Sequence, residues 1–120
     1  MIQETQLKIK GEDYQVWHEP DDATTYLKGI LRLSGKPEYQ PISDLLEAAL
    51  EASKNITLNL CDLEFLNSSG ITMLTMFVVK VRKKGDIDLT IKGSERILWQ
   101  TKSLKNLQRL MPTLTLEFQS

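Results

Sequence analysis

The spacing of apolar residues changes between helix-like and strand-like several times after the first forty residues, and this alternation constrains the fold more than any other feature. Over residues 41–53 apolar side chains recur three and four positions apart, which predicts an amphipathic helix with Pro41 in its first turn. Residues 56–61 are mostly apolar and predict a short buried strand. A strongly apolar helix over residues 69–82 follows, and Gly85 ends it.

The rest of the chain continues the alternation. Residues 87–91 predict a strand, and a third helix is expected to begin near Glu95, to weaken around residues 101–103 and to end at Pro112. Residues 114–118 predict a last strand. Strands that alternate with helices need crossover connections, which place those strands in a partly parallel sheet.

The first forty residues are typical of extended structure. Residues 6–10 and 14–17 alternate polar and apolar side chains on either side of a turn at residues 11–13, which predicts a hairpin with one buried face. Residues 24–33 are rich in strand-forming side chains, and Gly29 within them indicates a bulge or a close approach. The N-terminal strands are therefore expected at an antiparallel edge of the sheet.

The length of the chain fits one folding unit. The 120 residues suit a single compact domain with its own hydrophobic core. We predict one α/β domain over residues 1–120, with a mixed sheet of at least five strands. Residues 1–13 form an extra N-terminal extended segment, and residues 34–37 form a loop before the first helix.

The composition excludes several kinds of chemistry. Cys61 is the only cysteine and His18 the only histidine, which exclude an internal disulfide and most zinc sites. The apolar run over residues 73–79 is too short to span a bilayer, and the N-terminus shows no signal peptide. We therefore expect a cytoplasmic protein with no metal and no cofactor.

The charges are unevenly distributed. The net charge is −1, but residues 80–109 hold nine basic and three acidic side chains. A nucleic-acid footprint is one interpretation of this basic half. Four of these basic residues fall at an expected helix C-terminus, where cations offset the helix dipole; they are Lys80, Arg82, Lys83 and Lys84. No direct nucleic-acid partner is therefore expected.

The most informative segment covers residues 58–71. A strand ends there, a short loop is expected to cross its carboxyl edge, and Asn67-Ser68-Ser69-Gly70 opens a buried helix. Ligand and partner sites in open α/β sheets cluster at the carboxyl ends of strands. Free N–H groups at a helix start favour an anion, including a phosphate carried by one of the serines.

This segment resembles the signature of STAS domains, the fold of bacterial anti-anti-sigma factors and stressosome subunits. That signature is an apolar strand containing an Asp, followed by Asp-Ser-Ser-Gly at a helix start, and residues 58–60 and 67–71 match it here. The resemblance spans roughly residues 14–118 and implies helices packed mainly on one face of the sheet. It implies that a partner serine kinase of the anti-sigma type phosphorylates Ser68, with Ser69 as the alternative, and that a PP2C-type phosphatase removes the phosphate.

Two features depart from the signature. Asn59 and Asn67 stand where the family has Asp, so a partner that recognises a carboxylate beside the serine meets an amide here. Asn67 can still cap a helix through its side-chain oxygen. Two residues follow the last predicted strand, so we do not expect the C-terminal helix that is common in the family.

Residues around Ser68 are expected to form the partner surface. Asn67, Ser69 and Gly70 shape the helix start. The expected loop before them supplies the contact residues, with acidic side chains that face a basic partner; these are Asp62, Glu64, Phe65 and Leu66. The alternative is that Ser68-Ser69-Gly70 is no more than a helix cap.

The sequence therefore predicts a non-catalytic, phosphorylation-dependent signalling protein that resembles an anti-sigma factor antagonist in the regulation of transcription. A switchless STAS-like scaffold subunit of a larger assembly is the alternative. An enzyme is the weakest class, since no base, nucleophile and orienting group occur together. The sequence leaves open the partner, the downstream process and whether the protein forms a homo-oligomer.

Overall fold

The computed structural model describes residues 8–120, which form six strands and three helices. The strands are β1 (Lys8–Lys10), β2 (Tyr14–Glu19), β3 (Thr24–Leu31), β4 (Asn55–Leu66), β5 (Asp88–Ser94) and β6 (Thr115–Gln119). The helices are α1 (Gly35–Ala52), α2 (Ser68–Lys84) and α3 (Leu98–Leu110).

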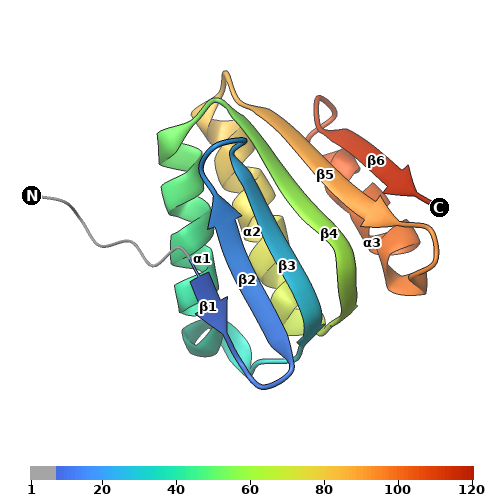
Figure 1. The fold of residues 1–120 in the computed structure, drawn as a ribbon. Helices are drawn as coiled ribbons and strands as arrows, with labels where there is room; N and C mark the ends of the chain where they lie inside the picture. The colour runs from blue at the N-terminus through green and yellow to red at the C-terminus, as the bar shows by residue number, and fades with distance from the viewer. Residues whose placement is uncertain (1–7) are drawn as a thin grey trace, which may run out of the picture.

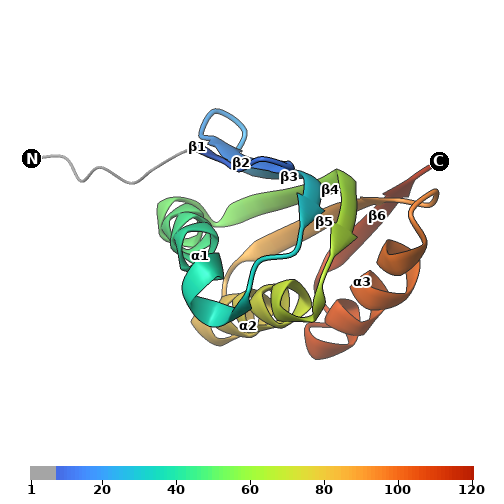
Figure 2. The ribbon, with the colours of Figure 1, turned by 90° about the horizontal axis from the view of Figure 1, so that it is seen from below.

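One mixed sheet contains all six strands in chain order, from β1 to β6 (Figure 1). The first three strands are antiparallel, and β3, β4, β5 and β6 run parallel to their neighbours. All three helices lie on one face of the sheet (Figure 2). The predicted fold class, an α/β mixed sheet with N-terminal antiparallel strands and helices on one face, is confirmed.

The predicted hairpin is confirmed for the residues that the structure describes. Ile9 of β1 pairs with Val16 of β2, whereas residues 6 and 7 of the expected strand lie outside the described residues. The bulge expected at Gly29 is also present, because the register between β3 and β4 shifts there and Gly29 has a φ of +96°.

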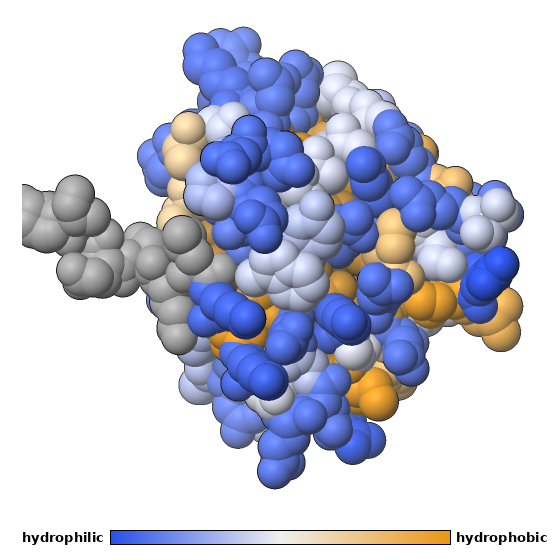
Figure 3. Space-filling view, viewed as in Figure 1, coloured by the Kyte–Doolittle hydropathy of each residue, from blue (hydrophilic) through white to orange (hydrophobic). Residues whose placement is uncertain are grey.

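The core lies between the sheet and the helices. Along β4, buried Ile56, Leu58 and Leu60 alternate with less buried Thr57 and Asn59, so every second side chain faces the helices. The opposite face of the sheet carries mainly hydrophilic residues (Figure 3). Within residues 8–120, no helix is long and apolar enough to cross a membrane.

Helix α1 begins earlier than predicted. The expected loop at residues 34–37 is wrong, because the helix begins at Gly35 and contains Pro41 in its interior. The additional turn is held by Glu38, whose carboxylate accepts a hydrogen bond from the N–H of Ser34 at 2.9 Å, and by Tyr39, which is buried. The position of Pro41, which suits the first turn of a helix, therefore predicts a helix start that is six residues too late.

Helix α3 is continuous where the sequence predicts weakening. It begins at Leu98 rather than near Glu95 and continues without interruption through residues 101–103 to Leu110. Buried Leu104 and Leu107 hold this helix against the sheet, so tertiary packing overrides the low helix propensity of the polar residues.

The second half of β4 leaves β5, and a buried glutamine fills the gap. Pairing between the two strands stops at Asn59 and Lys92, whereas β4 continues to Leu66. The side chain of Gln100, which is fully buried, donates to the carbonyls of Leu60 at 2.6 Å and Leu63 at 2.9 Å. Its oxygen accepts from the N–H of Ser94 at 2.7 Å, so this amide replaces the missing strand contacts.

We expect Gln100→Leu to lower the free energy of unfolding by about 2 kcal/mol or more, because the carbonyl of Leu60 and the N–H of Ser94 lose their partner, whereas the carbonyl of Leu63 keeps its contact with Trp99. Gln108→Leu is the matched control, since Gln108 makes one hydrogen bond, to the carbonyl of Leu114 at 3.0 Å, and its loss costs about 1 kcal/mol. Urea unfolding measures both. Equal losses in the two variants would contradict the role given to Gln100.

Candidate functional site

The start of α2 is organised by the side chain of Asn67, the residue between β4 and α2. Its Oδ1 accepts hydrogen bonds from the N–H of Gly70 at 3.0 Å and from the hydroxyl of Tyr39 at 2.7 Å. Its Nδ2 donates to the carbonyl of Leu33 at 2.9 Å. The amide of Asn67 therefore caps α2 and links it to α1 and to the segment that precedes α1. The sequence predicts the cap but not the two links.

Tyr39 was not identified from the sequence. It precedes Asn67 by 28 residues, and no local pattern links the two. Burial raises the pKa of Tyr39 above its ordinary value, a backbone hydrogen bond with Leu33 opposes this shift, and the nearby phenol of Tyr14 adds to it. The phenol therefore stays protonated and donates to Asn67 at neutral pH.

Two of the expected contact residues are structural. Leu66 is buried in the core, and Gly70 is buried beneath it. A Cβ atom on Gly70 would lie 2.2 Å from Cδ1 of Leu66 and 2.7 Å from the hydroxyl oxygen of Tyr39. Gly70 is therefore required for the close approach of α2 to α1, and the side chain of Leu66 belongs to the core rather than to a surface for a partner.

Ser68 is the exposed first residue of α2, whereas Ser69 is half-buried and turns toward α1. Within residues 8–120, the backbone N–H groups of Ser68 and Ser69 make no hydrogen bond, because the Asn67 side chain binds the N–H of Gly70 and its carbonyl binds that of Ile71. These two N–H groups and the helix dipole favour an anion at this position.

The expected loop at residues 62–66 is wrong, because β4 continues through it and pairs with β3 as far as Leu66. Trp99 contributes to this extension: its indole N–H lies 3.3 Å from the carbonyl oxygen of Leu63 and 3.1 Å from that of Glu64. Asp62, Glu64 and Phe65 are exposed on this strand. They are available to a partner as parts of a fixed strand rather than of a loop.

The two asparagines that replace the family's aspartates lie in different places. The side chain of Asn59 accepts a hydrogen bond from the N–H of Cys61 at 3.0 Å, at the point where β4 leaves β5. Asn67 follows eight residues later, at the far end of β4. An extended strand rises about 3.3 Å per residue, so Asn59 lies roughly 20 Å or more from Asn67 and does not contribute to the helix start.

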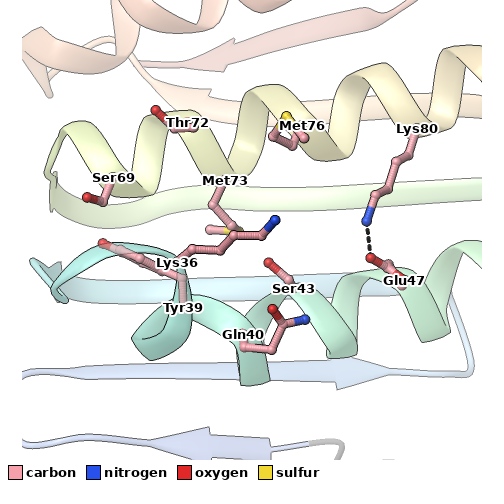
Figure 4. A pocket seen from close by; sticks show the side chains of 10 residues that line it. All are labelled: Lys36, Tyr39, Gln40, Ser43, Glu47, Ser69, Thr72, Met73, Met76 and Lys80. Carbon is pink, nitrogen blue, oxygen red and sulfur yellow. Dashed lines mark hydrogen bonds and ion pairs between the residues drawn. The ribbon is translucent and has the colours of Figure 1, made fainter.

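A groove of about 320 Å³ runs between α1 and α2 and begins at Ser69 (Figure 4). Met73 and Met76 provide apolar surface along it, and an ion pair between Glu47 and Lys80 crosses it. Lys36 lies over Met73 in this view. The apolar spacing of both helices is evident in the sequence, whereas the groove between them is evident only in the structure.

Large apolar side chains are exposed on β4, α2 and α3. The large hydrophobic residues that are exposed within residues 8–120 are Phe65, Met76 and Leu98, with exposed fractions of 46%, 51% and 82%. Phe65 precedes Ser68 by three residues, Met76 follows it by two turns, and Leu98 adjoins Trp99, which binds the end of β4. Apolar surface beside an exposed hydroxyl is typical of a site that binds protein.

Cys61 lies where β4 leaves β5, away from the start of α2. Burial raises the pKa of the Cys61 thiol and the charge of Asp62 raises it further, whereas Lys92 and a backbone hydrogen bond oppose the shift. Its Sγ lies 3.5 Å from the carbonyl oxygen of Gly93. No group of three His, Cys, Asp or Glu residues within residues 8–120 could hold a metal ion.

Three solved structures share this fold. A chain in the crystal structure of the diguanylate cyclase SiaD in complex with its activator SiaC, from Pseudomonas aeruginosa, superposes with a TM-score of 0.71 at 12% identity and covers 95% of this chain and 100% of that chain. SiaC of Pseudomonas aeruginosa gives 0.68 at 14% identity, covering 95% of each chain. The apo-SiaC crystal structure gives 0.66 at 14% identity, covering 95% and 98%.

No protein-family model matches the sequence, and a search of the curated proteins finds no match. The structural likeness therefore shows the class of fold, a small α/β domain of the SiaC kind, over nearly the whole chain. It does not extend to a shared family.

We expect Asn67→Asp to lower the free energy of unfolding by about 1–3 kcal/mol at pH 7. A carboxylate keeps the acceptor for Gly70 and Tyr39, but it replaces the donor to the Leu33 carbonyl with a second oxygen. Below about pH 4 the carboxyl is protonated and can donate again, so the difference from the wild type shrinks. Urea unfolding at both pH values measures it, and a variant as stable as the wild type at pH 7 would contradict the role of the amide donor.

Tyr39→Phe provides a test in alkaline solution. Because the folded state raises the pKa of Tyr39, its stabilising contribution is complete below about pH 10 and is lost as pH rises through the folded-state pKa. We expect the variant to be about 1 kcal/mol less stable at pH 7, and the two proteins to converge above pH 10. Parallel stability curves from urea unfolding at each pH would contradict this assignment.

Proposed function

We propose that this chain is a non-catalytic signalling regulator that binds a partner protein around the start of α2, and that phosphorylation of Ser68 controls this binding. One observation carries the proposal. Ser68 is exposed at the first position of a helix whose cap leaves two N–H groups free, exposed Phe65 precedes it by three residues, and exposed Met76 follows it by two turns of α2. An accessible hydroxyl at a helix start that favours an anion, with exposed apolar side chains on β4 and α2, supports the proposal.

The proposed effector is a signalling enzyme. SiaC, whose fold this chain shares, is an activator of the diguanylate cyclase SiaD. We extend this to the present chain as a regulator that binds a diguanylate cyclase or a comparable signalling enzyme. The resemblance of residues 67–71 to the STAS signature adds the controlling pair, a serine kinase of the anti-sigma type and a PP2C-type phosphatase.

Electrostatics support a switch without refolding. A phosphoserine adds about −1.5 to −2 charges at neutral pH. Beside one partner carboxylate at about 4 Å, each unit of charge costs about 1 kcal/mol in water and about 4 kcal/mol at a partly dried interface. Since about 1.4 kcal/mol changes affinity tenfold, one phosphate can lower partner affinity by orders of magnitude.

The domain itself tolerates the phosphate. The free N–H groups of Ser68 and Ser69 can bind its oxygens, and the start of α2 contains no acidic residue in its first turn that would repel it. The helix dipole adds a favourable contribution. The phosphate charge therefore lowers the affinity for the partner without lowering the stability of the domain.

A switchless scaffold is the second candidate, and the structure offers one observation in its favour. Asn67 places an amide where the STAS signature has a carboxylate, and this amide is fully used in holding α1 to α2. An enzyme that needs a carboxylate beside Ser68 would not find it. A scaffold would use the same apolar surface and would not respond to a charge on Ser68.

Affinity capture from native cells, with quantitative mass spectrometry, distinguishes these functions. With Ser68→Ala as bait we expect partner recovery similar to that with the wild-type chain, whereas Ser68→Asp recovers at least tenfold less. Thr113→Asp, in the exposed turn before β6, is the matched control and should recover the partner normally. Equal recovery by Ser68→Asp and Ser68→Ala would favour the scaffold and contradict the switch.

A further inference from the structure

The sheet has one face that the described chain leaves uncovered. Strands β3 to β6 are parallel, and parallel sheets occur almost only with both faces covered. Here α1, α2 and α3 cover one face, and no element within residues 8–120 covers the other, which we call the open face (Figure 2). Thr57 and Asn59 of β4 and Lys92 of β5 belong to it.

The strand register aligns one row of side chains straight across the open face. Each member pairs with the next across neighbouring strands; the row is Lys8, Trp17, Tyr26, Asn59, Lys92 and Glu117. The rings of Trp17 and Tyr26 stack, with centroids 5.0 Å apart and planes at 10°, and neither packs against the core. The row therefore contains an aromatic pair between polar and charged side chains.

The charges of this row have no partner within the described residues. Ion pairs within residues 8–120 join Arg32 to Asp13, Lys80 to Glu47 and Lys84 to Glu51, and none includes a member of the row. Lys8 lies at one edge of the sheet and Glu117 at the opposite edge. Opposite charges at the two ends make the row complementary to itself when it is reversed.

We propose that a second copy of this chain packs on the open face about a twofold axis parallel to the strands. This axis places the row of one copy against the row of the other copy, which runs in the opposite order across the strands. Lys8 then faces Glu117, Trp17 faces Lys92, and Tyr26 faces Asn59, each contact occurring twice in the symmetric dimer. The Oδ1 of Asn59 already accepts from Cys61, so its amide N–H₂ is the group that faces the Tyr26 hydroxyl.

The dimensions of the open face fit such a dimer. Sheets pack about 10 Å apart, which the long side chains of Lys8 and Glu117 can bridge. Six strands about 4.8 Å apart give a face about 24 Å wide, and with paired lengths of about 20 Å two copies together bury on the order of 1,000 Å². This lies at the lower limit for a specific interface, so we infer a weak, reversible dimer.

The dimer is independent of the proposed switch. Ser68 is at the start of α2, and α2 lies on the opposite face of the sheet (Figure 2). Loss of the dimer would therefore leave partner binding at α2 intact, and failure of the Ser68 switch would leave the dimer intact.

A charge swap tests the contact most directly. Sedimentation velocity should show that Lys8→Glu and Glu117→Lys each weaken the dimer at least tenfold, because each places like charges together at both symmetric contacts. The double variant Lys8→Glu/Glu117→Lys should return to within about threefold of the wild-type dissociation constant, since the pair is restored with its signs exchanged. Lys105→Glu, on the exposed side of α3, should not change the dimer.

A cysteine pair tests the direction of the axis. In a Cys61→Ser background, Lys8→Cys/Glu117→Cys should form a covalent dimer under mild oxidation, whereas Lys8→Cys alone should not. Unchanged circular dichroism shows that the variants are folded. A wild-type chain that stays monomeric up to about 0.5 mM, a double variant no better than the singles, or cross-linking by Lys8→Cys alone would overturn the proposal.

Discussion

The amide of Asn67 is the interaction on which the arrangement of the site depends. It accepts from the start of α2 and from buried Tyr39 of α1, and it donates to the carbonyl of Leu33 between β3 and α1. Three segments distant in sequence therefore meet at one side chain. Gly70 completes the contact, because any larger residue there would collide with Leu66 and Tyr39. The start of α2 is held in one position before any partner binds.

This constraint explains why an amide stands where the STAS signature has a carboxylate. A carboxylate would serve the cap but not the donor contact to Leu33. The same constraint leaves Ser68 exposed on a fixed support, with exposed Phe65 on β4 before it and exposed Met76 two turns farther along α2. The chain can then carry a phosphate without rearranging. Its two surfaces, the start of α2 and the open face of the sheet, lie on opposite sides and suit different partners.

The sequence was sufficient to predict what depends on local periodicity, namely the order of strands and helices, the N-terminal hairpin and, to within one residue, the start of α2, which was expected at Ser69 and lies at Ser68. It was not sufficient where distant residues decide the outcome. The predicted loop after Cys61 is a strand, because Trp99 and Gln100 supply hydrogen bonds from α3. The contact between Tyr39 and Asn67 and the groove between α1 and α2 likewise require packing that no local pattern encodes.

The central claim is that Ser68 carries a regulatory phosphate, and phosphopeptide mass spectrometry of the protein from its native cells under several growth conditions tests it most directly. The account predicts phosphate localised to Ser68, with an occupancy that changes between conditions. A peptide containing Ser68 and Ser69 that is detected with high coverage and is unmodified in every condition would contradict it. Phosphate on Ser69 alone would contradict the assignment to Ser68 and move the switch to the side chain that borders the groove.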